Sequence, residues 1–305
     1  MTLHPMAGQT PSGATPRLDE RPPAAPSAEA VMARAQTENY PVASRLLPRA
    51  QREHLLAVYG FPRLVDELGD APEIAPAERL GALAWLEGEL DAALAGHARH
   101  PLMVRLEATI DTCGLAREPF VRLIEANRLD QRRDRYETWE ELRAYCALSA
   151  DPVGEIVLGV FGEREQELIA LSDRICTALQ IAEHCQDVAE DLGRGRVYLP
   201  REDLARFGCA EEELHRRTAA PPLRAVLAFE VERGRGLLRE GLPLLARLRG
   251  RPRLAVAAFA AGGSAAFGAI ERAGYDVLAG PPRAGTARRL SALLGTLAAP
   301  EARRR

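Results

Sequence analysis

The chain has 305 residues, of which 47% are hydrophobic and 27% are charged, and its formal net charge is -3. That length is enough to bury a large core, and the absence of a basic excess argues against nucleic acid as a partner. The 40 basic residues other than His are all Arg, which excludes Schiff-base lysine chemistry and the P-loop lysine.

The cysteines and the two ends of the chain bear on its compartment. There are five cysteines, an odd number without a C-x-x-C pair, which argues against disulfides or structural zinc and favours a cytoplasmic protein. Residues 1–28 are rich in Pro, Ala, Thr and Gly and lack the apolar segment of a signal peptide, so we expect a disordered tail. Residues 298–305 are expected to be a flexible basic tail. No run approaches the roughly 18 apolar residues of a membrane span, although amphipathic surface helices leave peripheral membrane contact open.

The part between these tails, residues 29–297, is expected to form one all-α domain. Ala, Leu, Arg and Glu dominate it, β-branched residues rarely alternate, and prolines divide it into helix-sized pieces. Pro62 should kink or break the helix that contains it. The expected helices run over 28–38, 49–70, 77–97, 101–114, 117–130, 138–148, 152–161, 163–192, 210–217, 222–248, 252–275 and 284–297.

Two acidic stripes are the first candidates for chemistry. Asp66 and Asp70 are four residues apart, and Glu183, Asp187 and Asp191 continue the same spacing on another helix. Residues at this spacing share one helix face, where like charges repel each other. Such pairs are common on solvated faces, but apolar neighbours flank both stripes here, and a buried acidic face needs a compensating cation. Mg²⁺ takes one or two carboxylates together with phosphate oxygens, so facing stripes in a helical bundle could hold a diphosphate.

Three further segments complete the pattern: ENYPVASRLLP at 38–48, YCALSADPVG at 145–154 and GRGRVYLP at 193–200. With the two acidic motifs, and in this order over about residues 36–290, they resemble the squalene/phytoene synthase family of head-to-head prenyl synthases. Within that family, NYPVAS, SADPVG and QDVAED resemble the branch of the bacterial hopanoid pathway that forms hydroxysqualene.

The resemblance implies a single-domain helical isoprenoid-synthase bundle with a central active-site cavity and Mg²⁺ as cofactor. Asp66 and Asp70 match the first metal-binding pair, and Asp187 and Asp191 match the second. The other matched positions are Arg63 at the diphosphate, Tyr145 and Gln180 near the reacting carbons, Arg196 and Tyr198 in the segment that closes over the diphosphate, and Asn39 and Ser44 in the first segment. Tyr145 could stabilise a cation through its ring or steer water, or it could be a core tyrosine. His184 falls one residue off the acidic face, and we interpret it as structural.

Several positions depart from the family pattern. Glu183 stands where the family often has a metal-binding Asn, and Gln186 stands where phytoene-type enzymes have an Arg on the diphosphate. Glu38 and Asn39 replace a Lys-Ser pair that often contacts diphosphate. Because these positions lack the basic residues that contact diphosphate in the family, the sequence favours a substrate with one diphosphate over two diphosphate substrates.

The function implied by this resemblance is Mg²⁺-dependent ionisation of presqualene diphosphate, followed by capture of the rearranged cation by water to give hydroxysqualene. Two alternatives remain open. One is a squalene or presqualene diphosphate synthase that condenses two molecules of farnesyl diphosphate. The other is a catalytically silent helical subunit that binds polyprenyl chains or a pathway enzyme.

Overall fold

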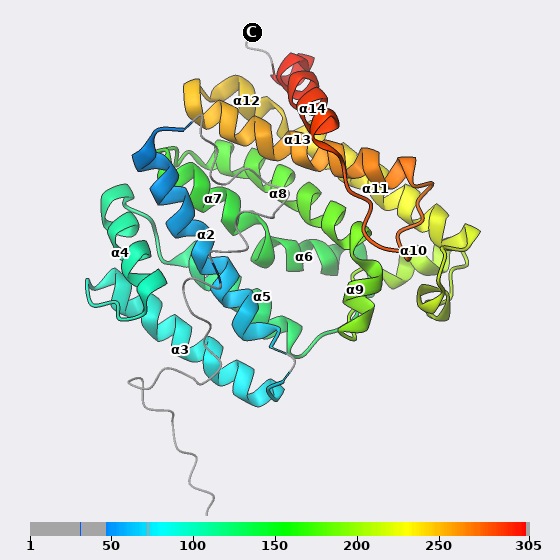
Figure 1. Ribbon diagram of the computed structural model, residues 1–305, viewed down its shortest axis with the longest axis horizontal. Helices are drawn as coiled ribbons and strands as arrows, with labels where there is room; N and C mark the ends of the chain where they lie inside the picture. Colours follow the sequence, from blue (N-terminus) through cyan, green and yellow to red (C-terminus); the bar gives the residue numbers. More distant parts are fainter. Residues whose placement is uncertain (1–30, 32–46, 72, 303–305) are drawn as a thin grey trace, which may run out of the picture.

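Helices are the regular elements of the part of the chain that the computed structural model describes, which is residues 31, 47–71 and 73–302 (Figure 1). The α-helices are α2 Arg49–Gly69, α3 Pro76–Leu94, α4 Pro101–Cys113, α5 Glu118–Asp130, α6 Trp139–Ser149, α7 Asp151–Val160, α8 Gln166–Gln186, α9 Val188–Gly193, α10 Arg201–Arg206, α11 Pro221–Gly241, α12 Pro243–Arg247, α13 Gly250–Arg272 and α14 Thr286–Ala298. Two 3-10 turns, η2 Glu211–His215 and η3 Pro300–Ala302, complete the list. The expectation of an all-α fold is confirmed.

Proline explains where many of these helices begin. Six of them, α3, α4, α5, α7, α11 and α12, carry a proline in the first two positions. The first turn has no intrahelical acceptor for its N–H groups, so the missing N–H of proline costs nothing there. Pro62 is different because it lies inside α2. The break that it could have caused does not occur, since α2 continues to Gly69.

Four differences from the expected helices concern breaks and short elements. The segment 163–192 is two helices, because Asp187 leaves the helical conformation with φ -103° and ψ 17°. The segment 222–248 divides before Pro243, which has no N–H to donate to the preceding turn. The segment 210–217 is the 3-10 turn η2, and the six-residue α10 was missed because it is too short to show a period.

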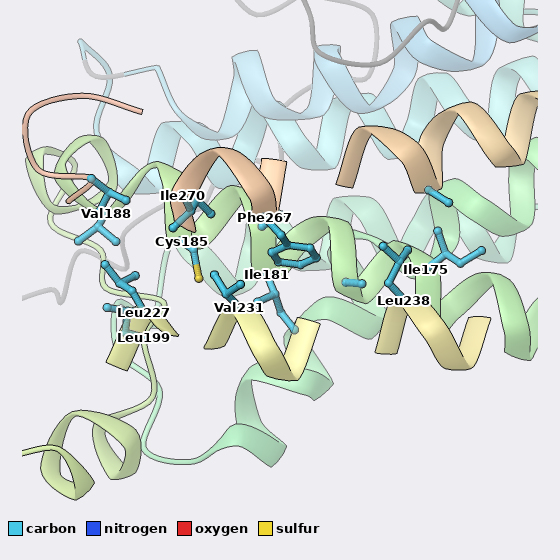
Figure 2. Packing of buried hydrophobic residues seen from close by; sticks show 14 of the residues in the cluster. Ile175, Ile181, Cys185, Val188, Leu199, Leu227, Val231, Leu238, Phe267 and Ile270 are labelled. Atoms are coloured by element: carbon cyan, nitrogen blue, oxygen red, sulfur yellow. The ribbon is translucent and has the colours of Figure 1, made fainter. Parts of the chain in front are cut away.

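Two layers of helices hold separate cores (Figure 1). Helices α2, α3, α4, α5 and α7 surround one core, in which the rings of Phe61 and Phe120 meet edge to face at 5.1 Å. In the second core, α8, α11 and α13 pack against one another, and Figure 2 shows Ile181, Val231 and Phe267 meeting there. Helices α7 and α8 also pack against each other, so they join the two layers.

The approach of α11 to α13 depends on a glycine. A Cβ at Gly234 would lie 2.3 Å from the ring of Phe267. Any side chain at this position would push the two helices apart, and α13 carries part of the cavity wall described below.

The C-terminal helices differ from expectation in two respects. By length and composition, α13 is the one described helix that could cross a membrane, with a mean hydropathy of 1.5 over its most apolar window, which corrects the expectation that no run approaches the length of a membrane span. Half of that window is buried inside the protein, so core packing accounts for its apolar character. The packed residues also extend past 297, because Ala302 is fully buried and its carbonyl accepts a hydrogen bond from Arg253 Nη2 at 3.2 Å.

Candidate active site

A cavity of about 1240 Å³ lies between α2, α5, α6, α7, α8, α9 and α13. Its volume exceeds the usual range for small-molecule pockets, which is roughly 300–1,000 Å³. Apolar lining residues precede the acidic ones along both α2 and α8, with Leu55 and Val58 on α2 and Leu179 on α8. The two walls therefore combine an apolar stretch, suited to a hydrocarbon chain, with an acidic stretch at the C-terminal ends of the helices.

The stripe on α2 lies where the sequence predicted it. Asp66 Oδ2 is 3.4 Å from Arg63 Nη1, and Asp66 Oδ1 accepts a hydrogen bond from Asn127 Nδ2 at 3.5 Å. Gly69 permits this approach of α5, since a Cβ there would lie 2.1 Å from the Asn127 side chain. The surroundings of the cavity wall raise the pKa of Asp66 to about 6 through desolvation, and Asp70 adds repulsion against the opposing effect of Arg63.

The second stripe sits at the junction of α8 and α9. Asp187 ends α8 and begins α9, yet its N–H still donates to the Glu183 carbonyl at 2.9 Å, and Asp191 N–H donates to the Asp187 carbonyl at 2.8 Å. The chain therefore continues in nearly the same direction from α8 into α9. The side chains of Glu183, Asp187 and Asp191 all line the cavity. Burial raises the pKa of Asp187, and burial together with the charge of Asp187 raises the pKa of Asp191 to about 7.

Arg196 links the two stripes. Its Nη1 donates to Asp70 Oδ1 at 2.7 Å, and its backbone N–H donates to the Asp191 carbonyl at 2.9 Å. The Arg196 side chain is only 12% exposed. The guanidinium thus pairs with a carboxylate of α2, and its charge lowers the pKa of Asp191 by less than burial and Asp187 raise it.

An aromatic cluster forms another part of the wall. The hydroxyls of Tyr145 and Tyr198 both donate to Asp130, at 2.8 and 3.1 Å, and the ring of His184 stacks on Tyr198 with centroids 4.0 Å apart. Burial and the Asp130 charge raise the pKa of both tyrosines, so both stay protonated donors. Burial lowers the pKa of His184 to about 3, so this ring is neutral, and its Nε2 lies 3.3 Å from Gln180 Nε2.

The cavity gathers most of the residues singled out in the sequence. Ten of them line it: Arg63, Asp66, Asp70, Tyr145, Gln180, Glu183, Asp187, Asp191, Arg196 and Tyr198. Asn39 and Ser44 lie outside the described residues.

Several lining residues were not found as site residues in the sequence, among them Asn127, Asp130, His184 and Arg283. His184 lines the cavity, although its place one residue off the acidic face indicates a structural role. Burial raises the pKa of Asp130, the last residue of α5, to about 6. Arg283 comes from the loop before α14, and its charge lowers the pKa of Asp187 against the effect of burial. Asp130 and Asp134 are four residues apart, a spacing that could have indicated Asp130, and His184 lies within the second acidic motif, whereas Asn127 and Arg283 belong to no spaced motif.

Comparison with known proteins agrees with this geometry. Residues 33–291 match the squalene/phytoene synthase family. Hydroxysqualene synthase of Sinorhizobium fredii is 39% identical over 178 residues, which are 58% of this chain and 60% of that protein. Hydroxysqualene synthase of Rhodopseudomonas palustris is 36% identical over 213 residues, 70% of this chain and 72% of that protein.

A solved structure gives similar evidence over more of the chain. The crystal structure of squalene synthase HpnC from Alicyclobacillus acidocaldarius is 46% identical, with a TM-score of 0.73 over 81% of this chain and 94% of that one. The family match covers far more than half of the sequence, and the similarity to the solved structure covers 94% of that chain. The chain is therefore an isoprenoid synthase that belongs to the squalene/phytoene synthase family.

Proposed function

We propose that this enzyme ionises presqualene diphosphate and lets water capture the rearranged cation. The bond between carbon and the diphosphate oxygen breaks, and the electron pair leaves with the diphosphate. The cyclopropylcarbinyl cation rearranges in the apolar part of the cavity. The oxygen of one water then adds to it, and loss of a proton gives hydroxysqualene.

The observation that carries the proposal is the layout of the cavity. Carboxylates stand on two walls, which Arg196 connects through its side chain to Asp70 and its backbone N–H to the Asp191 carbonyl, next to an apolar stretch in a volume of about 1240 Å³. A C30 substrate with one anionic end has the same division into a polar head and a long apolar body. The similarity to hydroxysqualene synthases supports the same reaction.

The carboxylates fit a magnesium cofactor. Asp66, Asp70, Glu183, Asp187 and Asp191 are the residues that would hold it. All five are oxygen donors, which suits Mg²⁺, because this ion takes one or two protein carboxylates and completes its shell with water and phosphate oxygens. Bound there, Mg²⁺ would supply Lewis-acid stabilisation of the leaving diphosphate.

The other polar residues would bind and orient. Arg63 and Arg196 are placed to bind diphosphate oxygens, because each borders an acidic stripe and lines the cavity. Tyr145 has its hydroxyl held by Asp130, which leaves its ring fixed on the cavity wall where it can stabilise a passing cation. Gln180 and the neutral His184 form a polar spot suited to holding the captured water, with His184 as an acceptor for its proton.

Gln186 favours a single diphosphate. It is buried, and its Nε2 donates to the carbonyl of Pro282. The side chain is thus committed to the backbone and carries no charge for a second diphosphate. The residue therefore supports a one-diphosphate substrate over the condensation of two farnesyl diphosphates.

The product distinguishes this function from its alternatives. The purified protein incubated with Mg²⁺ and presqualene diphosphate should release hydroxysqualene with or without NADPH, as identified by mass spectrometry. Squalene formed only with NADPH would make the enzyme a squalene synthase. Activity on farnesyl diphosphate alone would make it the condensing enzyme, and no diphosphate release from either substrate would support the silent subunit.

Stability should depend on pH and Mg²⁺ together. Asp66 and Asp191 titrate at about 6 and about 7 in the fold, above their ordinary value of 3.8, so the folded chain binds more protons than the unfolded chain between about pH 4 and pH 7. Without metal, the melting temperature should fall as pH rises through this window. A loss of about 1 kcal/mol, discounted for solvent screening, corresponds to roughly 2–4 °C.

Added Mg²⁺ should restore the melting temperature mainly at the upper end of the window, where the carboxylates are ionised. Differential scanning fluorimetry with EDTA or Mg²⁺ at each pH measures both effects. An equal response to Mg²⁺ at both ends of the window would contradict the assignment of the metal to these carboxylates.

A further inference from the structure

The outward face of α14 is apolar. Leu290 and Leu294 are 58% and 62% exposed, and the exposed Ala287, Ser291 and Ala298 fall at three- and four-residue steps around them. A surface helix normally turns its charged residues outward. Here they are confined to the first turns of the helix, and the outward stripe carries none.

The inward face of the same helix is apolar as well. Leu293 and Leu297 pack against the core that α8, α11 and α13 share, and Ala292 packs against Ala265 and Ala269 of α13. Figure 1 shows α14 lying along the outer side of α13, at the edge of the molecule. The inward face thus accounts for the attachment of α14 to the protein, and the outward leucines have no such role.

The charge around this face is mainly positive, although the exposed Glu271, which pairs with Arg235, lies in the last turn of α13. Residues 281–299 contain three Arg and no Asp or Glu, and residues 249–270, which include the exposed Leu254, also contain three Arg and no acid. The nearest acidic residue on the C-terminal side is Glu301. A chain of net charge -3 therefore presents an apolar helix face within a basic region. This combination is complementary to an anionic membrane surface.

We propose that the outward face of α14 docks on the surface of an anionic phospholipid bilayer. Leu290 and Leu294 enter the boundary between headgroups and acyl chains, and Arg288 and Arg289 lie at the level of the lipid phosphates. A second copy of the chain fits this face less well, because a two-fold contact between α14 helices would give the Arg side chains no acidic partner on the facing helix, where residues 281–299 contain no Asp or Glu. The bilayer meets both the apolar stripe and the positive charge.

The position of α13 relates the docking to the reaction, and this relation rests on the proposed function. Phe259 of α13 lines the cavity, while α14 packs on the outer side of the same helix. Docking through α14 sets α13 between the cavity and the bilayer. A C30 hydrocarbon chain then has a short way between the enzyme and the lipid phase in which it dissolves.

Vesicle co-sedimentation of the full chain, without Mg²⁺ or substrate, tests the docking independently of the reaction. The chain should bind vesicles of phosphatidylcholine and phosphatidylglycerol, and bind vesicles of phosphatidylcholine alone much less. The double variant Leu290→Ser, Leu294→Ser should bind about tenfold more weakly. The double variant Arg288→Gln, Arg289→Gln should lose roughly fivefold per charge on the anionic vesicles only.

The matched control removes exposed apolar side chains elsewhere. Leu94 and Val104 are 37% and 47% exposed and lie on α3 and α4, so the variant Leu94→Ser, Val104→Ser should bind like the parent chain. Circular dichroism checks that each variant is folded, and turnover of detergent-dispersed substrate should be unchanged in both serine variants. A Leu294→Trp variant should show a blue-shifted emission on the anionic vesicles that brominated lipid quenches.

Three outcomes would overturn the proposal. The parent chain could fail to bind anionic vesicles, or the α14 serine variant could bind as well as the control variant. The α14 serine variant could instead dissociate a dimer seen by sedimentation velocity while vesicle binding stays unchanged, which would assign the face to a second copy of the chain.

Discussion

Asp66→Asn and Asp187→Asn should each abolish measurable turnover, with kcat at least about 10²–10³-fold lower. The two residues lie on opposite walls of the cavity, and each amide would remove a charged oxygen ligand from the proposed Mg²⁺. The helical fold should persist, because the desolvation that raises the pKa of both carboxyls already disfavours their charged forms. In EDTA, the melting temperature should therefore stay equal to that of the parent chain or rise.

The control for these variants is Asp111→Asn. Asp111 is an exposed carboxylate on α4 that does not line the cavity, so its replacement should leave both kcat and the response to Mg²⁺ unchanged. Steady-state release of diphosphate and circular dichroism measure the two properties together. Near-normal turnover in either the Asp66 or the Asp187 variant would refute the assignment of metal ligands.

Arg196→Gln should lower kcat/KM by about 10²-fold or more. Arg196 donates to Asp70 across the cavity and holds the turn that carries Asp191. Removing a buried partner leaves a carboxylate uncompensated, which costs roughly 3–5 kcal/mol when the pair is fully buried and less at a cavity wall. The variant should also raise the pKa of Asp130, because the Arg196 charge is the main influence that opposes burial there.

Arg196→Lys should recover only part of the loss, because an ammonium lacks the planar fork that can serve Asp70 and a diphosphate oxygen together. Arg201→Gln is the matched control. Arg201 also pairs with a carboxylate, Glu137 at 2.7 Å, but both side chains are at least half exposed. The expected loss there is small. An Arg196→Gln variant with the kcat/KM of the control would remove Arg196 from the diphosphate site.

The family motifs lie far apart along the chain, but their residues meet in one cavity. Asp66 and Asp70 share a face because of helical spacing alone. The same spacing predicts that Glu183, Asp187 and Asp191 share one face of a single helix. The three side chains do line the same part of the cavity, but they belong to two helices, because α8 ends and α9 begins at Asp187. The three side chains still face the same way, because the backbone N–H groups of Asp187 and Asp191 each donate to the carbonyl four residues earlier, across the break.

The sequence by itself determined the all-α class, most helix boundaries and the two acidic stripes, because helical periodicity, proline positions and side-chain spacing are local properties. Only the tertiary structure decided which isolated residues join them. Asp130 enters the site from the end of α5 and Arg283 from the loop before α14, through contacts that depend on how the helices pack. Likewise, the leucines of α14 have the same periodic pattern on both faces of the helix, and the packing against α13 decides which pair contacts the core and which faces outward.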